Sequence, residues 1–317
     1  MRALVLSGGG SKGSFQAGVL RTILDNEPNT DYDIYAGVSV GALNCSKLAT
    51  GPLAEVLPEL EDVWLKKVKG SHSVWRHHLW YYVLAGMISI AFFIVAGFIS
   101  FIFNGPQWLT IIFGIFALVS FIIPWIALTR THSIYRTEPL RKLIEETLDL
   151  DALKNGGKRL RVGAVSFTTG EYRTVDEHNE HIIDWVMASS AFPIFFPRIP
   201  MLGQYWGDGG ITDVSPLKDA IEAGATEVDI ILASSTKPGY YHGLPGVLKQ
   251  ISRDLDVMQS EILRNDLEVH CMHANIKVRV FMPEGPLTSN PLSFEPERIR
   301  RMYEEGKRVA EKTLKKS

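Results

Sequence analysis

The sequence contains little cysteine and almost no net charge, which argues against a disulfide-stabilised scaffold and against a nucleic-acid-binding protein. Only two cysteines, Cys45 and Cys271, occur in 317 residues, and they lie far apart without the spacing of metal ligands. This pattern does not fit a disulfide-stabilised scaffold, so we expect both thiols to be reduced and buried in a cytoplasmic domain. The net charge of −2 gives no sign of a nucleic-acid partner, and we expect none.

Charge is missing altogether from one long segment, because residues 79–129 contain no Asp, Glu, Lys, Arg or His. Two apolar runs, 79–103 and 108–129, are separated only by Asn104-Gly105-Pro106-Gln107. Roughly 20 apolar residues suffice for a helix to cross a bilayer core of about 30 Å, and so short a breaker forms a turn. Helices in the core of a soluble domain usually keep one polar face, and these runs keep none. The sequence therefore predicts a transmembrane helical hairpin.

Positive residues flank this predicted hairpin on both sides, whereas its turn carries no charge. Because positive residues stay on the cytoplasmic side of a membrane, we expect both flanking parts and both termini to be cytoplasmic. We therefore expect an integral protein with two spans, in the inner membrane of a bacterium. Residues 1–78 and 130–317 would form one discontinuous domain interrupted by 79–129. The flanking positive residues are Lys66, Lys67, Lys69 and Arg76 before the hairpin and Arg130, Arg136, Arg141 and Lys142 after it.

A glycine-rich turn follows the first apolar strand, residues 2–6. The turn reads Ser7-Gly8-Gly9-Gly10-Ser11-Lys12-Gly13, and a helix is expected to begin near Ser14. Backbone N–H groups gathered at a helix N-terminus bind negative charge, either a phosphate or a developing oxyanion. Gly8, Gly10 and Gly13 also match the dinucleotide-binding pattern G-x-G-x-x-G, which leaves a nucleotide site open. A Walker loop does not fit, because Lys12 precedes Gly13.

A second tight turn, Gly37-Val38-Ser39-Val40-Gly41, lies between a predicted strand at 33–36 and a predicted helix at 42–49. A strand-to-helix turn with small flanking residues is typical of a nucleophile elbow, which exposes a serine hydroxyl. The helix dipole favours the negative charge that develops on this oxygen during attack. A dinucleotide-binding domain would instead need an acidic residue at the end of the second strand, where Ser39 stands.

A hydroxyl nucleophile needs a proton acceptor within hydrogen-bond reach, and Asp208 is the candidate. It lies in Tyr205-Trp206-Gly207-Asp208-Gly209-Gly210, where the flanking glycines would allow it to occupy a tight turn with other backbone segments close by. The same residues would also be found in a simple Asp-Gly hairpin turn without a catalytic role. No downstream histidine lies in a recognisable loop motif, so we do not expect a catalytic histidine. The downstream histidines are His178, His181, His242, His270 and His273.

Together, these three motifs resemble, in order and spacing, those of the patatin-like phospholipases. The resemblance covers about residues 1–65 and 135–280, with further similar segments at 188–193, 196–197, 213–217 and 225–231. It implies a three-layer α/β domain, related to the α/β-hydrolases, with a mainly parallel central sheet. It also implies a Ser–Asp dyad that hydrolyses lipid acyl esters without a histidine, a metal or an organic cofactor.

On this interpretation Ser39 is the nucleophile, Asp208 is its general base, and the backbone N–H groups of Gly9, Gly10 and Ser11 form the oxyanion hole. Two features depart from the family: lysine stands at position 12, where arginine is usual, and the hairpin is inserted. Lysine keeps the charge but lacks the planar fork of arginine. The residues that support the motifs are Gly8, Lys12, Gly13, Gly37, Gly41, Gly209 and Gly210.

The expected partners are membrane phospholipids or other acyl lipids, and a homo-oligomer formed through the hairpin stays open. One alternative is a patatin-fold membrane protein without turnover that serves as a scaffold or binds lipid. The other alternative, a dinucleotide-dependent oxidoreductase, rests on Gly8, Gly10 and Gly13 alone.

Overall fold

A computed structural model describes residues 1–77, 79–103, 105–130, 132–235, 276–288 and 290–315, with a few isolated positions between 250 and 264. His242, His270, Cys271 and His273 lie outside the described residues. The chain divides into two compact units. One unit comprises Met1–Val74, Glu138–Pro193 and Arg198–Ser317, and the other comprises Trp75–Thr137 and Ile194–Pro197.

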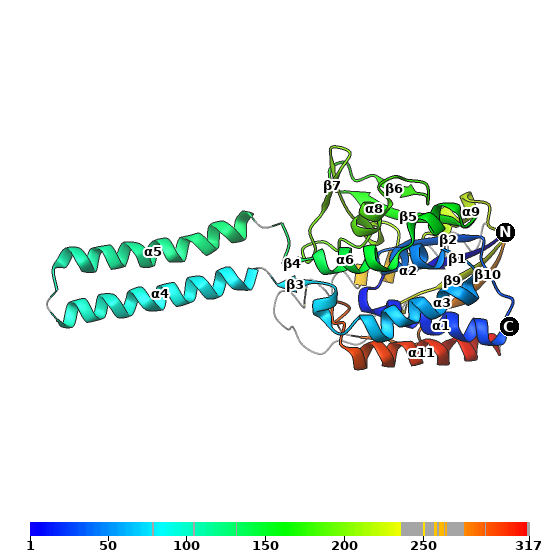
Figure 1. Cartoon of the computed structure of the whole chain (residues 1–317), viewed down its shortest axis with the longest axis horizontal. Coiled ribbons are helices and arrows are strands. Elements are labelled where there is room, and N and C mark those ends of the chain that lie inside the picture. Colours follow the sequence, from blue (N-terminus) through cyan, green and yellow to red (C-terminus); the bar gives the residue numbers. More distant parts are fainter. Residues whose placement is uncertain are drawn as a thin grey trace. The chain divides into compact units, whose positions relative to one another are not determined.

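A mainly parallel sheet forms the centre of the first unit (Figure 1). Its strand order is β10-β9-β1-β2-β5-β8-β7, and β6 also pairs with β5. Neighbours from β10 to β5 run parallel, whereas β6 and β8 run antiparallel to β5. The predicted α/β class with a mainly parallel sheet is confirmed. The strands are β1 (Arg2–Leu6), β2 (Ile34–Val38), β5 (Arg159–Ser166), β6 (Tyr172–Val175), β7 (Ile199–Met201), β8 (Gln204–Asp208), β9 (Glu227–Ile231) and β10 (Lys277–Phe281).

Helices cover both faces of this sheet, which explains why its central strands are apolar on both sides. Ala3 and Ala36 face α9 in one apolar cluster. Side chains alternate along a strand, so Gly37 faces the other way, where its Cα lies against Gly41 of α2. Helices α1, α3 and α11 pack together in this unit (Figure 1). The helices are α1 (Gly13–Asn26), α2 (Val40–Leu48), α3 (Leu53–Asp62), α6 (Glu138–Thr147), α7 (Leu150–Asn155), α8 (Ile182–Ser189), α9 (Leu217–Glu222) and α11 (Pro296–Leu314).

The second unit consists of two long apolar helices, α4 (Leu79–Ile102) and α5 (Gln107–Arg130), and a short antiparallel ribbon of β3 (Arg76–His77) and β4 (Tyr135–Arg136). The two helices pack against each other. Their contacts include a hydrogen bond of 2.8 Å between the hydroxyls of Ser89 and Ser120, and the ring of Phe93 stacked on that of Phe116. The predicted helical pair is therefore present.

Two membrane spans are not confirmed. Among the described residues one helical segment, Val83–Ile102, is long and apolar enough to cross a membrane. In α5 the apolar stretch found among the described residues is shorter, Gln107–Ser120. Both helices nevertheless expose large apolar side chains, including Phe92, Phe98 and Ile111, each more than 60% exposed. Such a surface is typical of a site that meets lipid or another protein.

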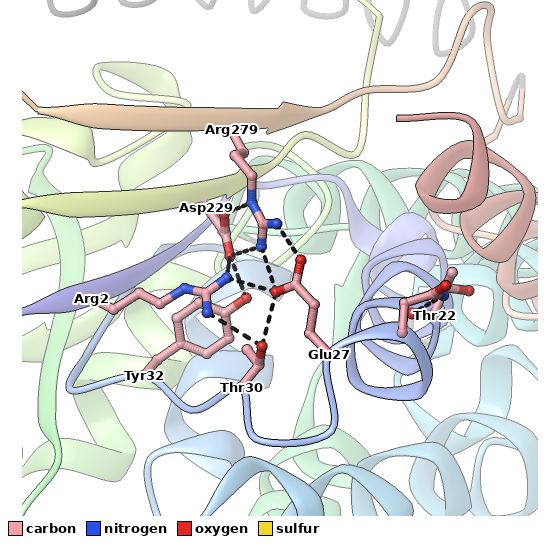
Figure 2. Close-up of polar contacts among 8 residues, drawn as sticks. Arg2, Thr22, Glu27, Thr30, Tyr32, Asp229 and Arg279 are labelled. Carbon is pink, nitrogen blue, oxygen red and sulfur yellow. Dashed lines mark hydrogen bonds and ion pairs between the residues drawn. The ribbon is translucent and has the colours of Figure 1, made fainter. Parts of the chain in front are cut away.

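A cluster of ion pairs joins β1, β9 and β10 to the segment after α1 (Figure 2). Asp229 accepts hydrogen bonds from Arg2 at 2.8 Å and from Arg279 at 2.7 Å. The buried hydroxyl of Tyr32 also donates to Asp229, at 2.7 Å. A hydrogen bond from Arg279 lowers the pKa of Glu27 to about 2, so this carboxylate stays ionised. Because these charges are paired with one another, we interpret the cluster as a structural one.

Candidate active site

The strand-to-helix turn holds Ser39 in a strained conformation. Its backbone angles are φ 55° and ψ −130°, between the end of β2 and the start of α2. A non-glycine residue in this region costs of the order of 1–3 kcal/mol and persists only where the surroundings impose it. The close crossing here leaves no room for side chains at two neighbouring positions. A Cβ at Gly37 would lie 2.4 Å from the carbonyl carbon of Gly41, and one at Gly41 would lie 2.1 Å from the carbonyl oxygen of Leu6.

The glycine-rich turn after β1 lies beside Ser39. A Cβ at Gly8 would lie 3.2 Å from the Cβ and 3.9 Å from the hydroxyl oxygen of Ser39. Gly10 has φ +58°, and a Cβ there would lie 2.4 Å from the carbonyl oxygen of Pro291. Glycine tolerates this left-handed conformation, which strains other residues. The glycine-rich turn and the turn that carries Ser39 are separated in the sequence, and they meet in the fold at the carboxyl ends of β1 and β2.

The backbone amides of this turn differ in whether they have partners. The N–H of Gly8 donates to the carbonyl of Val214 at 3.4 Å, and that of Ser11 donates to the carbonyl of Pro291 at 2.8 Å. Within the described part of the chain, the N–H groups of Gly9 and Gly10 have no hydrogen-bond partner. The expectation for Ser11 needs correction, because its amide proton is already engaged and does not point freely at a ligand. Gly9 and Gly10 stay as candidate donors.

Asp208 is the last residue of β8 and is only 1% exposed. Its carboxylate accepts a hydrogen bond from the backbone N–H of Gly210 at 2.8 Å. Burial raises the pKa of Asp208 to about 7, although the side chain of Ser39 and the N–H of Gly210 both lower it. The antiparallel pairing of β8 with β5 brings Asp208 opposite Ala164. The fold therefore brings the predicted nucleophile close enough to the predicted base for the Ser39 side chain to lower the pKa of Asp208.

Two serines to which the sequence motifs assign no role hold the backbone of Ser39. The N–H of Ser39 donates to the hydroxyl of Ser189 at 2.9 Å, and that hydroxyl donates to the carbonyl of Gly163 at 2.6 Å. The hydroxyl of Ser190 donates to the carbonyl of Ser39 at 3.5 Å. The only sequence signal was the segment 188–193, which resembles a family segment but indicates no role for either serine.

The other motif residues pack around this site. A Cβ at Gly13 would lie 2.4 Å from the side chain of Val40, and one at Gly209 would lie 2.5 Å from the carbonyl oxygen of Gly163, so both positions need glycine for close packing. Lys12 is buried, 5% exposed, and its ammonium group donates to the hydroxyl of Ser234 at 2.6 Å. This places a positive charge against the end of β9 and beside the glycine turn.

No metal centre is found in the part of the chain that the structure describes, where no three His, Cys, Asp or Glu residues gather closely enough to hold an ion. His178 and His181, the downstream histidines within the described ranges, have side chains that are 68% and 57% exposed. Each lies within 4 Å of a glutamate that adjoins it in sequence. Their exposure distinguishes them from the buried Asp208.

A family model described as patatin-like phospholipase matches residues 4–221, which include all three motifs. Among solved structures, VipD from Legionella pneumophila is 16% identical, with a TM-score of 0.49, over 99% of this chain and 67% of VipD. The type III effector protein ExoU is 13% identical, with a TM-score of 0.35, over 99% of this chain and 53% of ExoU. The chain thus spans about half the length of ExoU. No curated protein matches the chain.

Proposed function

The chain belongs to the patatin-like phospholipase family, and from this premise we propose that it hydrolyses lipid acyl esters with Ser39 as nucleophile and Asp208 as general base. The observation that carries the proposal is the position of the buried carboxylate of Asp208 next to the side chain of Ser39, which lowers the pKa of this carboxyl. A nucleophile beside a base is the arrangement that activates a hydroxyl for attack.

The proposed reaction has two steps. Ser39 Oγ attacks the carbonyl carbon of the acyl ester while its proton passes to the carboxylate of Asp208. The tetrahedral intermediate collapses to an acyl-serine ester, and protonated Asp208 returns the proton to the departing alcohol. Water then attacks the acyl-serine, with Asp208 again accepting the proton and then giving it back to Ser39 Oγ as the fatty acid leaves.

The negative charge on the carbonyl oxygen needs donors, and we propose the N–H groups of Gly9 and Gly10. Their freedom among the described residues and their place beside Gly8, which abuts Ser39, support this role. The positive charge of buried Lys12 next to this turn would favour the same oxyanion. We leave Ser11 out of the proposed donors because Pro291 already holds its amide.

Activity is expected to rise with pH through about 7. Asp208 must be ionised to accept a proton, and burial raises its pKa to about 7. Below this pH the carboxyl is protonated and kcat/KM falls about tenfold per pH unit, since a single group controls it. The measurement is kcat/KM for a short-chain ester whose hydrolysis does not itself depend on pH in this range. A profile that is flat from about pH 5 to pH 8 would exclude Asp208 as the base.

Gly10→Ala is expected to lower kcat about a hundredfold, by displacing one oxyanion donor. The added Cβ would meet the carbonyl oxygen of Pro291 at 2.4 Å, and φ +58° disfavours alanine, so the turn must shift. Lys12→Arg is the matched variant in the same turn. It keeps the charge and should change kcat by less than about threefold.

Gly10→Ala, Lys12→Arg and Lys12→Met are measured for kcat on a short-chain ester, with thermal unfolding as the check on folding. If Gly10→Ala turned over normally while Lys12→Met lost all activity, the lysine side chain would be the oxyanion ligand and the backbone proposal would be wrong.

We also propose that α4 and α5 form two membrane spans, with the catalytic unit on the cytoplasmic side and membrane phospholipids or other acyl lipids as substrates. The apolar segment Val83–Ile102 and the exposed apolar side chains of both helices support this. The positive residues at 66–76 and 130–142 support the orientation. The exposed apolar surface of these helices is also compatible with association of two copies.

The competing proposal is a patatin-fold scaffold without turnover. A fluorophosphonate probe distinguishes the two, because it reacts covalently only with an activated serine. We expect one label per chain, located at Ser39 by mass spectrometry of peptides and absent from Ser39→Ala. An unlabelled native protein would favour the scaffold. Mass spectrometry of the products released from mixed bilayer lipids would then identify the headgroup and the acyl position that are cleaved.

A further inference from the structure

A cavity of about 470 Å³ lies between α11 and the segment that follows β10, and the proposed mechanism does not use it. The segment contributes residues 284–288, and α11 contributes Arg298, Arg301, Met302, Glu305 and Arg308. Pro286, Leu287 and Met302 make part of the wall apolar. Its volume falls in the range of sites that bind small molecules, about 300–1,000 Å³.

The charges around this cavity are not balanced. Arg308 lies 3.9 Å from Glu284 and 2.6 Å from Glu305, so both lining carboxylates already have that arginine as a partner. Arg298 donates to the hydroxyl of Thr288 at 3.0 Å. Among the described residues neither Arg298 nor Arg301 pairs with a carboxylate. Two guanidinium groups, three residues apart on one helix, therefore line a cavity with no counter-charge of their own.

The same segment contacts the glycine turn of the candidate active site. The hydroxyl of Thr288 accepts a hydrogen bond from the N–H of Asn290 at 3.1 Å, and the carbonyl of Pro291 accepts that of Ser11 at 2.8 Å. The carbonyl oxygen of Pro291 is also the atom that leaves no room for a side chain at Gly10. A short chain of contacts thus runs from Arg298 through Thr288 to the turn that carries the proposed oxyanion donors.

We propose that this cavity binds a phosphate-bearing anion through Arg298 and Arg301, and that its occupancy raises turnover at Ser39. Guanidinium groups bind phosphate oxygens in pairs of parallel hydrogen bonds, which suits two arginines on one helix face. The remaining volume and the apolar wall would admit a small organic group attached to the phosphate. A bound anion would join α11 to residues 284–288 and so restrict the segment that fixes the glycine turn. The source of the phosphate is either a free metabolite or a lipid headgroup.

Binding is tested by calorimetric titration of glycerol 3-phosphate into the full chain reconstituted in neutral phosphatidylcholine nanodiscs. Arg298→Gln and Arg301→Gln should each weaken binding at least about tenfold. Arg300→Gln is the matched control, because Arg300 is an exposed arginine on the same helix that does not line the cavity. Ser39→Ala should bind as well as the native protein, so this test does not depend on hydrolysis.

A second experiment measures kcat on a short-chain ester in nanodiscs that contain phosphatidylglycerol, without the free phosphate ester. Binding of glycerol 3-phosphate in the first experiment identifies a free ester as a ligand. A rise in kcat on the short-chain ester with phosphatidylglycerol alone, lost in Arg301→Gln and kept in Arg300→Gln, identifies a headgroup, and either result supports the proposal. If glycerol 3-phosphate did not bind and phosphatidylglycerol did not raise kcat, or if Arg300→Gln had the same effect as Arg301→Gln, the cavity would not be the site.

Coupling to the active site is measured as kcat on a short-chain ester, with and without saturating glycerol 3-phosphate. We expect at least about a twofold rise in kcat in the native protein and in Arg300→Gln, and none in Arg301→Gln. Binding without any change in kcat would refute the coupling. If the native protein bound the anion but hydrolysed no ester at all, the proposed function would be wrong while the binding site would stand.

Discussion

Ser39→Ala and Asp208→Asn are each expected to reduce ester hydrolysis by at least about a thousandfold, and the double variant is expected to be no worse than either alone. The reason is that, in the proposed mechanism, Ser39 and Asp208 act as one unit. Asp208 is the buried carboxylate next to the Ser39 side chain, and without Ser39 this carboxylate has no nucleophile to activate. The measurement is kcat/KM of the three variants on a short-chain ester and on lipid bilayers.

Asp219→Asn is the matched control for Asp208→Asn. Asp219 is also a largely buried aspartate whose pKa burial raises, but it accepts a hydrogen bond from Tyr172 at 3.0 Å and makes none with Ser39. Its variant should keep turnover near the native value. Near-native activity in Asp208→Asn would show that another group is the base, and the histidines outside the described residues would then have to be tested.

Stability measurements separate lost chemistry from lost folding in Asp208→Asn. The pKa of Asp208 is raised from 3.8 to about 7 in the folded protein, so the folded state binds a proton more tightly than the unfolded state does. The stabilising contribution of protonated Asp208 should therefore be lost as pH rises from about 4 to 7, and the asparagine variant lacks this pH-dependent contribution. We expect Asp208→Asn to melt at a higher temperature than the native protein at about pH 8, and by a smaller margin at about pH 5.

The parts of the fold that the sequence predicts well are those with local signals. The strands at 2–6 and 159–166 are observed with the predicted bounds, and α1 and α2 begin within a few residues of the predicted positions. Each is an apolar run that ends at glycines or in a tight turn. Such signals depend only on neighbours in the chain, so they need no knowledge of the sheet order.

Contacts between distant segments could not be predicted in the same way. Ser189 holds the amide of Ser39 from 150 residues away, and Pro291 occupies the amide of Ser11. Neither residue lies in a pattern that indicates such a role, because the hydrogen bond depends on where the tertiary fold brings the segment. The raised pKa of Asp208 likewise results from burial, which a glycine-framed aspartate in a sequence does not reveal.

The two apolar helices raise a separate question, because their predicted role in a membrane depends on composition and exposure. Side chains such as Phe98 and Phe101 are 64% and 75% exposed. In water this surface would favour aggregation or association, whereas in a bilayer it would be solvated by lipid. Anchoring would also hold the catalytic unit at its substrate, which raises the effective substrate concentration without adding any contact at the reacting atoms.

Replacing Trp80–Leu128 with a short Gly/Ser linker tests anchoring directly. We expect the variant to hydrolyse monomeric short-chain esters at the native rate and to lose about a thousandfold in activity on bilayers, the size of effect that effective concentration gives. Ser89→Ala, which removes the hydrogen bond to Ser120 but keeps both apolar helices, is the control and should keep its bilayer activity. Full bilayer activity in the linker variant would contradict anchoring. Loss of both activities would instead show that α4 and α5 are needed for the fold or for association of the catalytic unit, since the ester assay requires no membrane.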